Sequence, residues 1–316
     1  MPLEPGEGPV VIVDYGSSQG KNSLGPLRTA IEAVRQKVGG ERPILVYHED
    51  LPINDFNALF DVLYNDPDSY ALNQPNVFPC AIGRSFYEEV LPASSVDIGW
   101  SSYAAMWLSR VPMPIPGHFY WAKSGGETRA AFERQAAQDW ERFLSLRAKE
   151  LRPGGRFVLS VPAGHHDGST GFEELMDLAN ATLADMVAEG VVATDERARM
   201  VHGGILRPLR DLLAPFAREL RFADLTVEHS EINPVPDAAW AAFEQDGGEE
   251  ALASARTSFF RVTFAPTLAG ALAGDAERRR AFYDRLEFGL KRKVLNAPTP
   301  INSLIATIVL AKGEVA

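Results

Sequence analysis

The sequence predicts an α/β protein with a Rossmann-like, doubly wound sheet, mostly parallel with an antiparallel last strand, and with a helical cap. Short apolar runs rich in β-branched residues alternate with helical patterns over the first half of the chain, which is typical of parallel sheets with crossover helices. The second half is mainly helical before one last β pattern. Ligands of such sheets bind at the carboxyl ends of the strands, beneath the expected cap.

Five apolar runs in the first half are bounded by turn residues and are expected to form buried strands. They cover residues 10–13, 44–47, 77–82, 96–100 and 157–161. Helical patterns between them cover residues 24–38, 55–63 and 127–151, and Pro153-Gly154-Gly155 is expected to close the last of these helices. Strand and helix therefore alternate as a parallel sheet requires.

The second half is expected to supply the cap. Its helical patterns cover residues 171–189, 195–218 and 249–293, a strand is expected at 220–228, and the closing strand at 304–310. The sheet core is assigned to residues 1–164 with 219–232 and 300–316. The helical cap over the substrate pocket is assigned to residues 165–218 with 233–299.

Composition excludes several classes of protein. The chain has 316 residues, of which 46% are hydrophobic, so it supplies a substantial core. Its 31 basic and 42 acidic residues give a net charge of -11, which argues against a nucleic-acid partner. No apolar run is long enough to cross a membrane. The single cysteine, Cys80, forms no intramolecular disulfide and is expected to be a small core residue, so a cytoplasmic location is expected.

The segment Gly16-Ser17-Ser18-Gln19-Gly20 fits two chemistries. It matches the G-x-S-x-G turn that presents the nucleophile of an α/β-hydrolase, and it also fits a glycine loop that binds a cofactor through its main chain. A hydrolase turn follows several strands, whereas one expected strand precedes this segment. The last histidine, His229, is followed by the closing strand, and no His-Gly-Gly segment lies upstream. The hydrolase interpretation is therefore disfavoured.

The cofactor interpretation explains more residues. Asp14 ends the first strand and is followed by Gly16, Gly20 and a helix, so that main-chain N–H groups approach a polar ligand closely. Glu49-Asp50 ends the second strand, where a carboxylate accepts hydrogen bonds from the hydroxyls of a ribose. The spacing Asp-x-Gly-x-x-x-Gly favours S-adenosylmethionine (SAM) over a dinucleotide, which leaves a nicotinamide-dependent oxidoreductase as a remote alternative.

Four segments together resemble the SABATH family of SAM-dependent carboxyl methyltransferases, which includes the salicylate, benzoate, jasmonate and indole-acetate enzymes. In chain order they are residues 14–23 (DYGSSQGKNS), 50–60 (DLPINDFNALF), 83–87 (GRSFY) and 101–112 (SSYAAMWLSRVP). The resemblance continues through 153–156 and 186–190. It implies a class I methyltransferase sheet, SAM as cofactor with S-adenosylhomocysteine (SAH) as product, and a homodimer.

The activity implied by the resemblance is methylation of the carboxylate of a small apolar acid, aromatic or aliphatic, to its methyl ester. A cofactor-binding paralogue with little turnover and an N-methyltransferase of a small heterocycle are the alternatives. The plant enzymes carry a longer segment before the first strand, including a lid and a glutamine that contacts the substrate. The chain therefore resembles an N-terminally shortened member.

The resemblance also implies the cofactor site. Asp14, Gly16, Ser17 and Asn22 would surround the methionine part of SAM, and Asp50 would bind the ribose. Leu51 would pack on the adenine from one side, and Ser85 with Phe86 from the other. Ser101 and Ser102 would lie beside the sulfonium. Asn54, Asp55 and Asn57 are left outside the site, because they are typical of residues that cap the helix beginning there.

The acceptor site implied by the resemblance begins with Tyr103, Met106 and Trp107, of which Tyr103 and Trp107 are the candidate catalytic residues. The indole N–H of Trp107 is the candidate donor to the substrate carboxylate. Further lining positions align with Pro162, Met176, Phe260, Thr263 and Asn302. A carboxylic acid is ionised at pH 7, so no general base is required. No metal is expected, because His165-His166-Asp167 fits a solvated loop without further ligands at suitable spacing.

Overall fold

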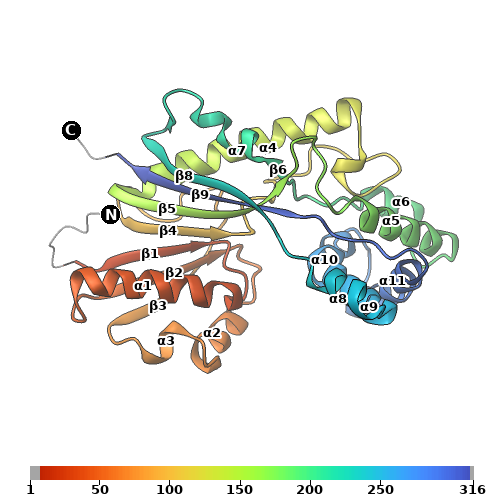
Figure 1. Ribbon diagram of the computed structural model, residues 1–316, viewed down its shortest axis with the longest axis horizontal. Coiled ribbons are helices and arrows are strands. Elements are labelled where there is room, and N and C mark those ends of the chain that lie inside the picture. Colours follow the sequence, from red (N-terminus) through yellow and green to blue (C-terminus); the bar gives the residue numbers. More distant parts are fainter. Residues whose placement is uncertain (1–7, 314–316) are drawn as a thin grey trace.

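The central sheet of the computed structural model, which describes residues 8–313, has the strand order β3-β2-β1-β4-β5-β9-β8-β7 (Figure 1). Neighbouring strands are parallel from β3 to β5 and antiparallel from β5 through β9 and β8 to β7. The parallel strands are β1 (Val10–Tyr15), β2 (Ile44–Asp50), β3 (Val77–Gly83), β4 (Val96–Ser102) and β5 (Leu151–Gly164). The predicted fold class is therefore confirmed.

Four later strands complete the sheet. They are β7 (Arg221–Phe222), β8 (Leu225–Pro234) and β9 (Leu304–Lys312), and the short β6 (Arg207–Pro208) pairs with the end of β5. The last strand lies inside the sheet, between β5 and β8, although it is the last to be reached along the chain. It returns to the sheet from the far helical end of the molecule (Figure 1).

Helices cover both faces of the sheet because alternate strand residues are apolar on both sides. Val10 and Ile12 pack on one face with α1 (Leu24–Val38), α2 (Phe56–Asn65) and α3 (Tyr70–Asn73). Val11 and Val13 pack on the opposite face with the long α4 (Gly126–Glu150). The predicted helix over 24–38 is confirmed, and Asp55 caps α2 by accepting a hydrogen bond from Ala58 N.

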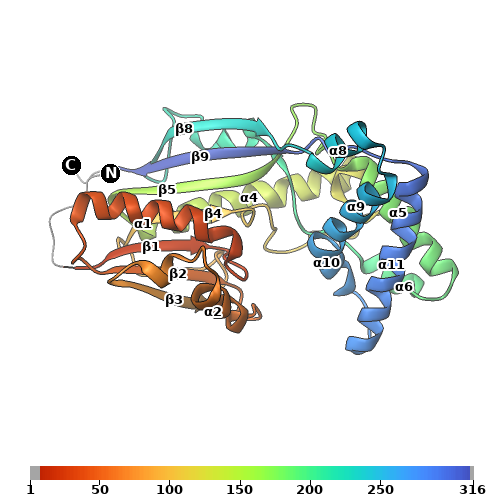
Figure 2. The same ribbon diagram turned by 60° about the horizontal axis from the view of Figure 1, so that its bottom comes forward.

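A second group of helices lies at the carboxyl end of the parallel strands (Figure 2). We call it the cap. It contains α5 (Glu173–Ala188), α6 (Thr194–Arg199), α8 (Ala238–Asp246), α9 (Glu249–Thr263), α10 (Ala265–Ala269) and α11 (Ala276–Asn296). In the described part of the chain no helix is long and apolar enough to span a bilayer. The residue boundaries assigned to core and cap stay a prediction.

Two predicted elements differ in the structure. Pro153-Gly154-Gly155 lies inside β5, which begins directly after α4, rather than in a loop that closes the helix. The helix expected at 195–218 is replaced by α6, an extended segment, and α7 (Leu209–Leu213). The extended segment forms because Gly203 and Gly204 pair with the loop after β4, at the isolated bridge between Trp107 and Gly204.

Two further predictions about the sheet are corrected. The strand expected at 220–228 is a hairpin, because Ala223 and Asp224 both adopt positive φ between β7 and β8. Cys80 is only partly buried, not a core residue, because β3 is an edge strand with one open side. The predicted strands at 10–13, 44–47, 77–82, 96–100 and 304–310 are confirmed, each extended at its carboxyl end.

Candidate active site

A cavity of about 550 Å³ lies at the carboxyl ends of β1, β2 and β4, facing the cap. It is the place where sheets of this kind bind ligands. Most of the residues predicted for the cofactor and the reacting groups line it, namely Gly16, Ser17, Asn22, Asp50, Leu51, Ser85, Phe86, Ser102, Tyr103 and Trp107. Segments that are far apart in the sequence are thus brought to one cavity.

The turn after β1 is held by main-chain hydrogen bonds rather than by its hydroxyl groups. Gly16 N and Ser17 N both donate to the carbonyl of Glu49, each at 2.9 Å. Gly16 has φ of +80°, and a Cβ on it would lie 2.2 Å from the Cβ of Ala104. Glycine is therefore required twice, by the backbone conformation and by the close approach of the loop after β4.

The same turn is tied to the end of β2 by a second set of contacts. Ser18 N donates to Oδ2 of Asp50 at 2.7 Å, and Leu51 N donates to Oδ1 at 2.7 Å. Asn54 Nδ2 donates to the carbonyl of Ser18 at 2.8 Å. Among the described residues no histidine hydrogen-bonds to Ser17 or Ser18, which the hydrolase interpretation would require. The turn is thus built to present main chain to the cavity.

Glu49 and Asp50, paired in the sequence, have different environments. Asp50 lines the cavity, whereas Glu49 is buried beneath the turn, where its Oε2 accepts a hydrogen bond from Gly16 N at 3.2 Å. Its Oε1 has no hydrogen-bond partner within residues 8–313. Burial raises the pKa of Glu49 to about 9, so this carboxyl group is protonated at neutral pH. Glu49 supports the turn, and Asp50 presents its carboxyl group to the cavity.

Asp14 and Ser101 lie behind the cavity wall, because each points into the sheet rather than toward the cavity. Oδ2 of Asp14 lies 3.1 Å from His48 Nδ1, and Nε2 of the same ring lies 2.6 Å from the hydroxyl of Tyr70. Ser101 Oγ donates to the carbonyl of Tyr15 at 2.9 Å. Both side chains are buried. Asp14 links the end of β1 to β2, and Ser101 links the end of β4 to β1.

The loop after β4 supplies the aromatic wall. Tyr103 has φ of +59°, a conformation that is strained for a residue with a side chain, and its amide donates to the carbonyl of Ser160 at 2.9 Å. Tyr103 is 50% exposed and lines the cavity. Trp107 is held through its main chain, because its amide donates to Ala104 O and its carbonyl accepts from the hydroxyl of Tyr87. Met106 is buried beneath this wall and does not line the cavity.

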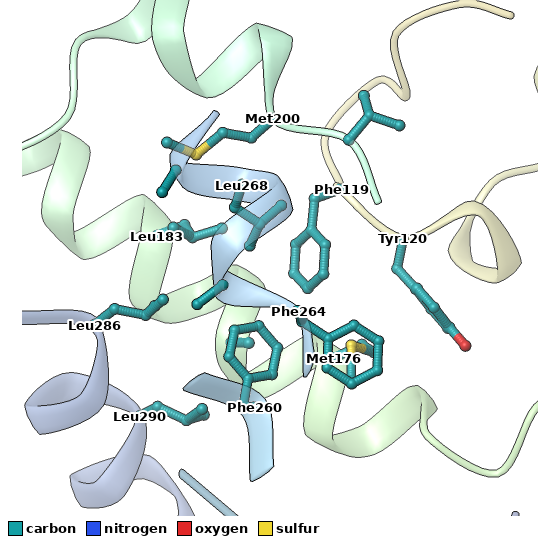
Figure 3. Close-up of a cluster of buried hydrophobic side chains, with 14 of the residues drawn as sticks. Phe119, Tyr120, Met176, Leu183, Met200, Phe260, Phe264, Leu268, Leu286 and Leu290 are labelled. Carbon is teal, nitrogen blue, oxygen red and sulfur yellow. The ribbon is translucent and has the colours of Figure 1, made fainter. Parts of the chain in front are cut away.

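The remaining predicted acceptor residues are not brought to this cavity. Met176 and Phe260 are buried in the cap, where they pack among Leu183, Phe264, Leu286 and Leu290 (Figure 3). Pro162 is buried in β5, and Thr263 ends α9. Asn302 is exposed, and its carbonyl accepts a hydrogen bond from His165 Nε2 at 2.6 Å. The acceptor role of these five residues stays a prediction.

Several cavity residues are absent from the sequence-based set. Ala104, Tyr87, Leu108 and Ser109 lie within or beside the segments that carried the resemblance, so a wider reading of those segments would have included them. Thr267 is different, because it is the one residue of the cap that lines the cavity among the described residues, and it lies one helical turn beyond Thr263. The cap therefore reaches the cavity through α10.

A family model described as SAM dependent carboxyl methyltransferase matches residues 3–200, more than half of the chain. The chain belongs to this family. The resemblance drawn from the four sequence segments is therefore confirmed. The match includes β1 to β5, α5 and the loop after β4, so it covers the whole wall of the cavity except Thr267.

Curated relatives agree with this family. The chain is 33% identical over 186 residues to methyltransferase LUC1 of Fusarium sp, which is 58% of this chain and 48% of that protein. It is 30% identical over 251 residues to salicylate carboxymethyltransferase of Clarkia breweri, covering 75% of this chain and 67% of the relative. The chain spans about half the length of several curated relatives that it matches.

Among solved structures, loganic acid methyltransferase with SAH superimposes with a TM-score of 0.76. The sequence identity is 22%, and the match covers 97% of this chain and 85% of that one. At this identity the likeness shows the shared fold, a methyltransferase sheet with its helical cap. It extends beyond the family model into the second half of the chain.

The residues of the cavity fit the cofactor of this family. A side chain at Gly16 would fill the narrow space against Ala104, and the turn instead offers main chain at that point. The Asp50 carboxylate lies at the cavity beside the apolar Leu51 and Phe86, a donor and acceptor set that suits a nucleoside with two hydroxyl groups and a flat base. Among the described residues no cluster of side chains is arranged to hold a metal ion.

Proposed function

We propose that this protein is a SAM-dependent O-methyltransferase that converts the carboxylate of a small apolar acid into its methyl ester. The single observation that carries the proposal is one cavity in which the glycine turn and Asp50 face the aromatic segment Tyr103 to Trp107. Membership of the carboxyl methyltransferase family supports the same reaction. When bound, SAM supplies an activated methyl group, and SAH remains after the transfer.

The cofactor side of the cavity would be formed by residues from three strand ends. Gly16, Ser17 and Asn22 would hold the methionine part, and Asp50 would accept hydrogen bonds from the ribose hydroxyls. Leu51 and Ser85 with Phe86 would border the adenine. Asp14 and Ser101 would act from the second layer by fixing the strand ends, and Ser102 would lie next to the reacting methyl group.

The acceptor side needs few ionisable groups. A carboxylate is already charged at neutral pH, so the protein has to orient it and remove water from it rather than take its proton. Tyr103 and Trp107 form the wall on which the acid would lie, and the indole N–H of Trp107 is the proposed donor to the carboxylate oxygen that does not react. Thr267 would close the cavity from the cap.

The size of the acceptor is proposed from the packing of the cap. The side chains of Met176 and Phe260, which are expected to line the pocket, pack among neighbouring apolar side chains. The space left near Trp107 therefore suits a small acid. Relatives named for salicylate, benzoic acid and loganic acid support acids as the substrate class, and their names supply the first compounds to test.

We also propose that the protein works in the cytoplasm as a homodimer, without a nucleic acid or a membrane as partner. The single cysteine and the net charge of -11 support the location and the absence of a nucleic-acid partner, and the family resemblance supports the dimer. The mass of the purified protein in solution, measured by light scattering, tests the oligomeric state. A monomeric mass at all concentrations would contradict the dimer.

The activity is tested by two measurements on the same protein. Titration calorimetry with SAH measures cofactor binding, and mass spectrometry detects methyl esters after incubation with SAM and a panel that includes benzoate and salicylate. We expect SAH to bind and at least one acid to gain a methyl group. Binding of SAH without any ester would favour a cofactor-binding paralogue. Tight binding of NADH without binding of SAH would favour an oxidoreductase.

A further inference from the structure

A second cavity, of about 340 Å³, is formed by α4, the loop after β5, β6 and α7 (Figure 1). The described residues that line it are all different from those that line the active site. Two of them nevertheless hold the loop after β4, because Ile205 N donates to Met106 O at 2.9 Å and Nη2 of Arg207 donates to Ala105 O at 3.0 Å. The second cavity is therefore separate from the active site but joined to it through that loop.

Three arginine side chains and two carboxyl groups line the second cavity. Nε of Arg129 donates to Oε1 of Glu133 at 2.9 Å, and Nε of Arg210 lies 3.5 Å from Oδ1 of Asp211. The third arginine, Arg207, makes hydrogen bonds to main-chain carbonyls and no ion pair within residues 8–313. One guanidinium group is thus left without a carboxyl partner, although the protein as a whole carries a net charge of -11.

Arg207 is the buried member of this group, with 7% of its surface exposed. Its Nη1 donates to Ala136 O and its Nη2 to Ala105 O, each at 3.0 Å, while its Nε has no hydrogen-bond partner in the described part of the chain. Burial lowers the pKa of Arg207 to about 10, so the group still carries its charge at neutral pH. A buried cation without a paired anion is unfavourable, and an anion in the cavity would stabilise it.

The other two arginines have donors to spare. Nη2 of Arg129 donates to the carbonyl of Gly168 at 3.0 Å, and Nη1 of Arg210 donates to the carbonyl of His166 at 2.7 Å. Nη1 of Arg129 and Nη2 of Arg210 have no partner among the residues that the structure describes. A Cβ at Gly168 would lie 2.7 Å from Nη2 of Arg129, so the glycine leaves room for this guanidinium group. Guanidinium groups with unused N–H donors bind carboxylate and phosphate groups well.

The rest of the lining is apolar and comes from Trp121, Ala136, Ala137, Ile205, Pro208 and Ala214. The guanidinium carbon of Arg129 lies 5.1 Å from the centroid of the Trp121 ring, so an aromatic face stands beside the charged group. Arg210 and Asp211 are exposed, whereas Arg207 and Trp121 are buried, which places the opening of the cavity at α7. This combination suits a ligand that has an apolar body and one anionic group.

We propose that this cavity is a second binding site, for a small organic anion whose carboxylate or phosphate group pairs with Arg207, Arg129 and Arg210. The site differs from the one proposed for SAM and the acid, and its ligand binds without SAM, so the inference does not rest on the proposed function. Because Arg207 also holds Ala105 O, a bound anion would help to fix the loop after β4 in place.

The test is titration calorimetry in the absence of SAM with four probes. These are benzoate, phenyl phosphate, inorganic phosphate and the uncharged benzamide. The double variant Arg129→Gln with Arg210→Gln removes two guanidinium groups, and Ala137→Phe fills the cavity from the exposed face of α4 without changing its charge. Arg207 is left unchanged, because it also holds two carbonyl groups.

Two variants serve as controls. Arg134→Gln removes the same charge from α4 outside the cavity, where Arg134 pairs with Glu127 on the surface. Trp107→Ala alters the active site and leaves the second cavity intact. Thermal unfolding shows which variants are folded.

We expect the wild-type protein to bind benzoate or phenyl phosphate at least about tenfold more tightly than benzamide, since hydrogen bonds to charged groups are strong. Binding should weaken at least about tenfold in the double variant and in Ala137→Phe, and it should change less than about twofold in Arg134→Gln and Trp107→Ala. The tighter of the two organic anions identifies the anionic group that the site prefers.

Three results would overturn the proposal. They are no binding of either organic anion, equal binding of benzamide, and unchanged anion binding in the folded cavity variants. Loss of binding in Trp107→Ala alone would place the anion in the active site and also reject the second site. Inorganic phosphate bound as tightly as phenyl phosphate would reject an organic ligand. None of these results bears on SAH binding or methyl transfer, which are measured separately.

Discussion

The Gly16→Ala substitution tests whether the close approach of the first turn to the loop after β4 is what shapes the cofactor site. Two costs add in this variant. The positive φ of +80° costs about 1–2 kcal/mol for a residue with a side chain. The new methyl group would also lie 2.2 Å from Ala104 Cβ, and overpacking of this kind costs typically about 1–3 kcal/mol.

Two further variants separate the cost of the backbone conformation from the cost of the steric clash. Gly117 also has positive φ, +73°, but nothing lies within 4 Å of a Cβ there, so Gly117→Ala carries the backbone cost alone. The double variant Gly16→Ala with Ala104→Gly removes the clash, because the next atoms, Ala104 Cα and Phe86 Cε1, lie at an ordinary 3.6 Å. Together these variants isolate the steric contribution.

The assay is titration calorimetry with SAH, accompanied by thermal unfolding. If the turn escapes the clash by leaving its position, the Kd for SAH should rise about 5-fold to 150-fold in Gly16→Ala, the equivalent of about 1–3 kcal/mol. The Kd should stay near the wild-type value in Gly117→Ala and recover in the double variant. A Gly16→Ala protein that binds SAH as tightly as Gly117→Ala would refute the reasoning.

Three further predictions concern other parts of the site. Between pH 4.5 and about 9 the folded protein keeps a proton on Glu49 that the unfolded chain releases. The free energy of unfolding should therefore fall as pH rises through that range, with no further change from this group above it. Glu49→Gln should remove this part of the pH dependence, measured by chemical unfolding. Asp50→Ala should weaken SAH binding about tenfold or more in calorimetry. Trp107→Phe should chiefly raise the KM of the acid in kinetic assays. The reverse pattern would contradict both assignments. Phe260→Ala should lower the free energy of unfolding in urea by about 3–5 kcal/mol, because the ring is buried in the cap. A loss of acid turnover with unchanged stability would instead favour the predicted acceptor role of Phe260.

The cofactor side of the site could be predicted from the sequence because its signals are local. Each of three segments begins at the carboxyl end of a strand, and parallel strands bring such ends together: the turn 14–20, the carboxylates at 49–50 and the segment 101–107. The sequence could not show that Glu49 and Asp50 have different roles. Their roles are decided by the twofold alternation of β2, which buries one carboxyl group beneath the turn and leaves its neighbour at the cavity.

The acceptor side was harder to predict from the sequence, because it depends on contacts between distant segments. Met176 and Phe260 have the same apolar character whether they line a pocket or fill a core, and the packing of α11 against α5 and α9 decides between the two. The segment around His202 has no strand pattern, because its extended form comes from pairing with residues 106–108. Thr267 reaches the cavity only because α10 follows α9 after a break at Phe264.

The place of β9 has a consequence for biosynthesis. Residues Leu304–Lys312 pair with both β5 and β8, so β8 has no partner on that side until these residues have left the ribosome. The first five strands can associate early during translation, whereas β8 and its hairpin partner β7 join the sheet only when β9 has been made. Chains released before residue 304 would expose two unpaired strand edges, which are sites for aggregation.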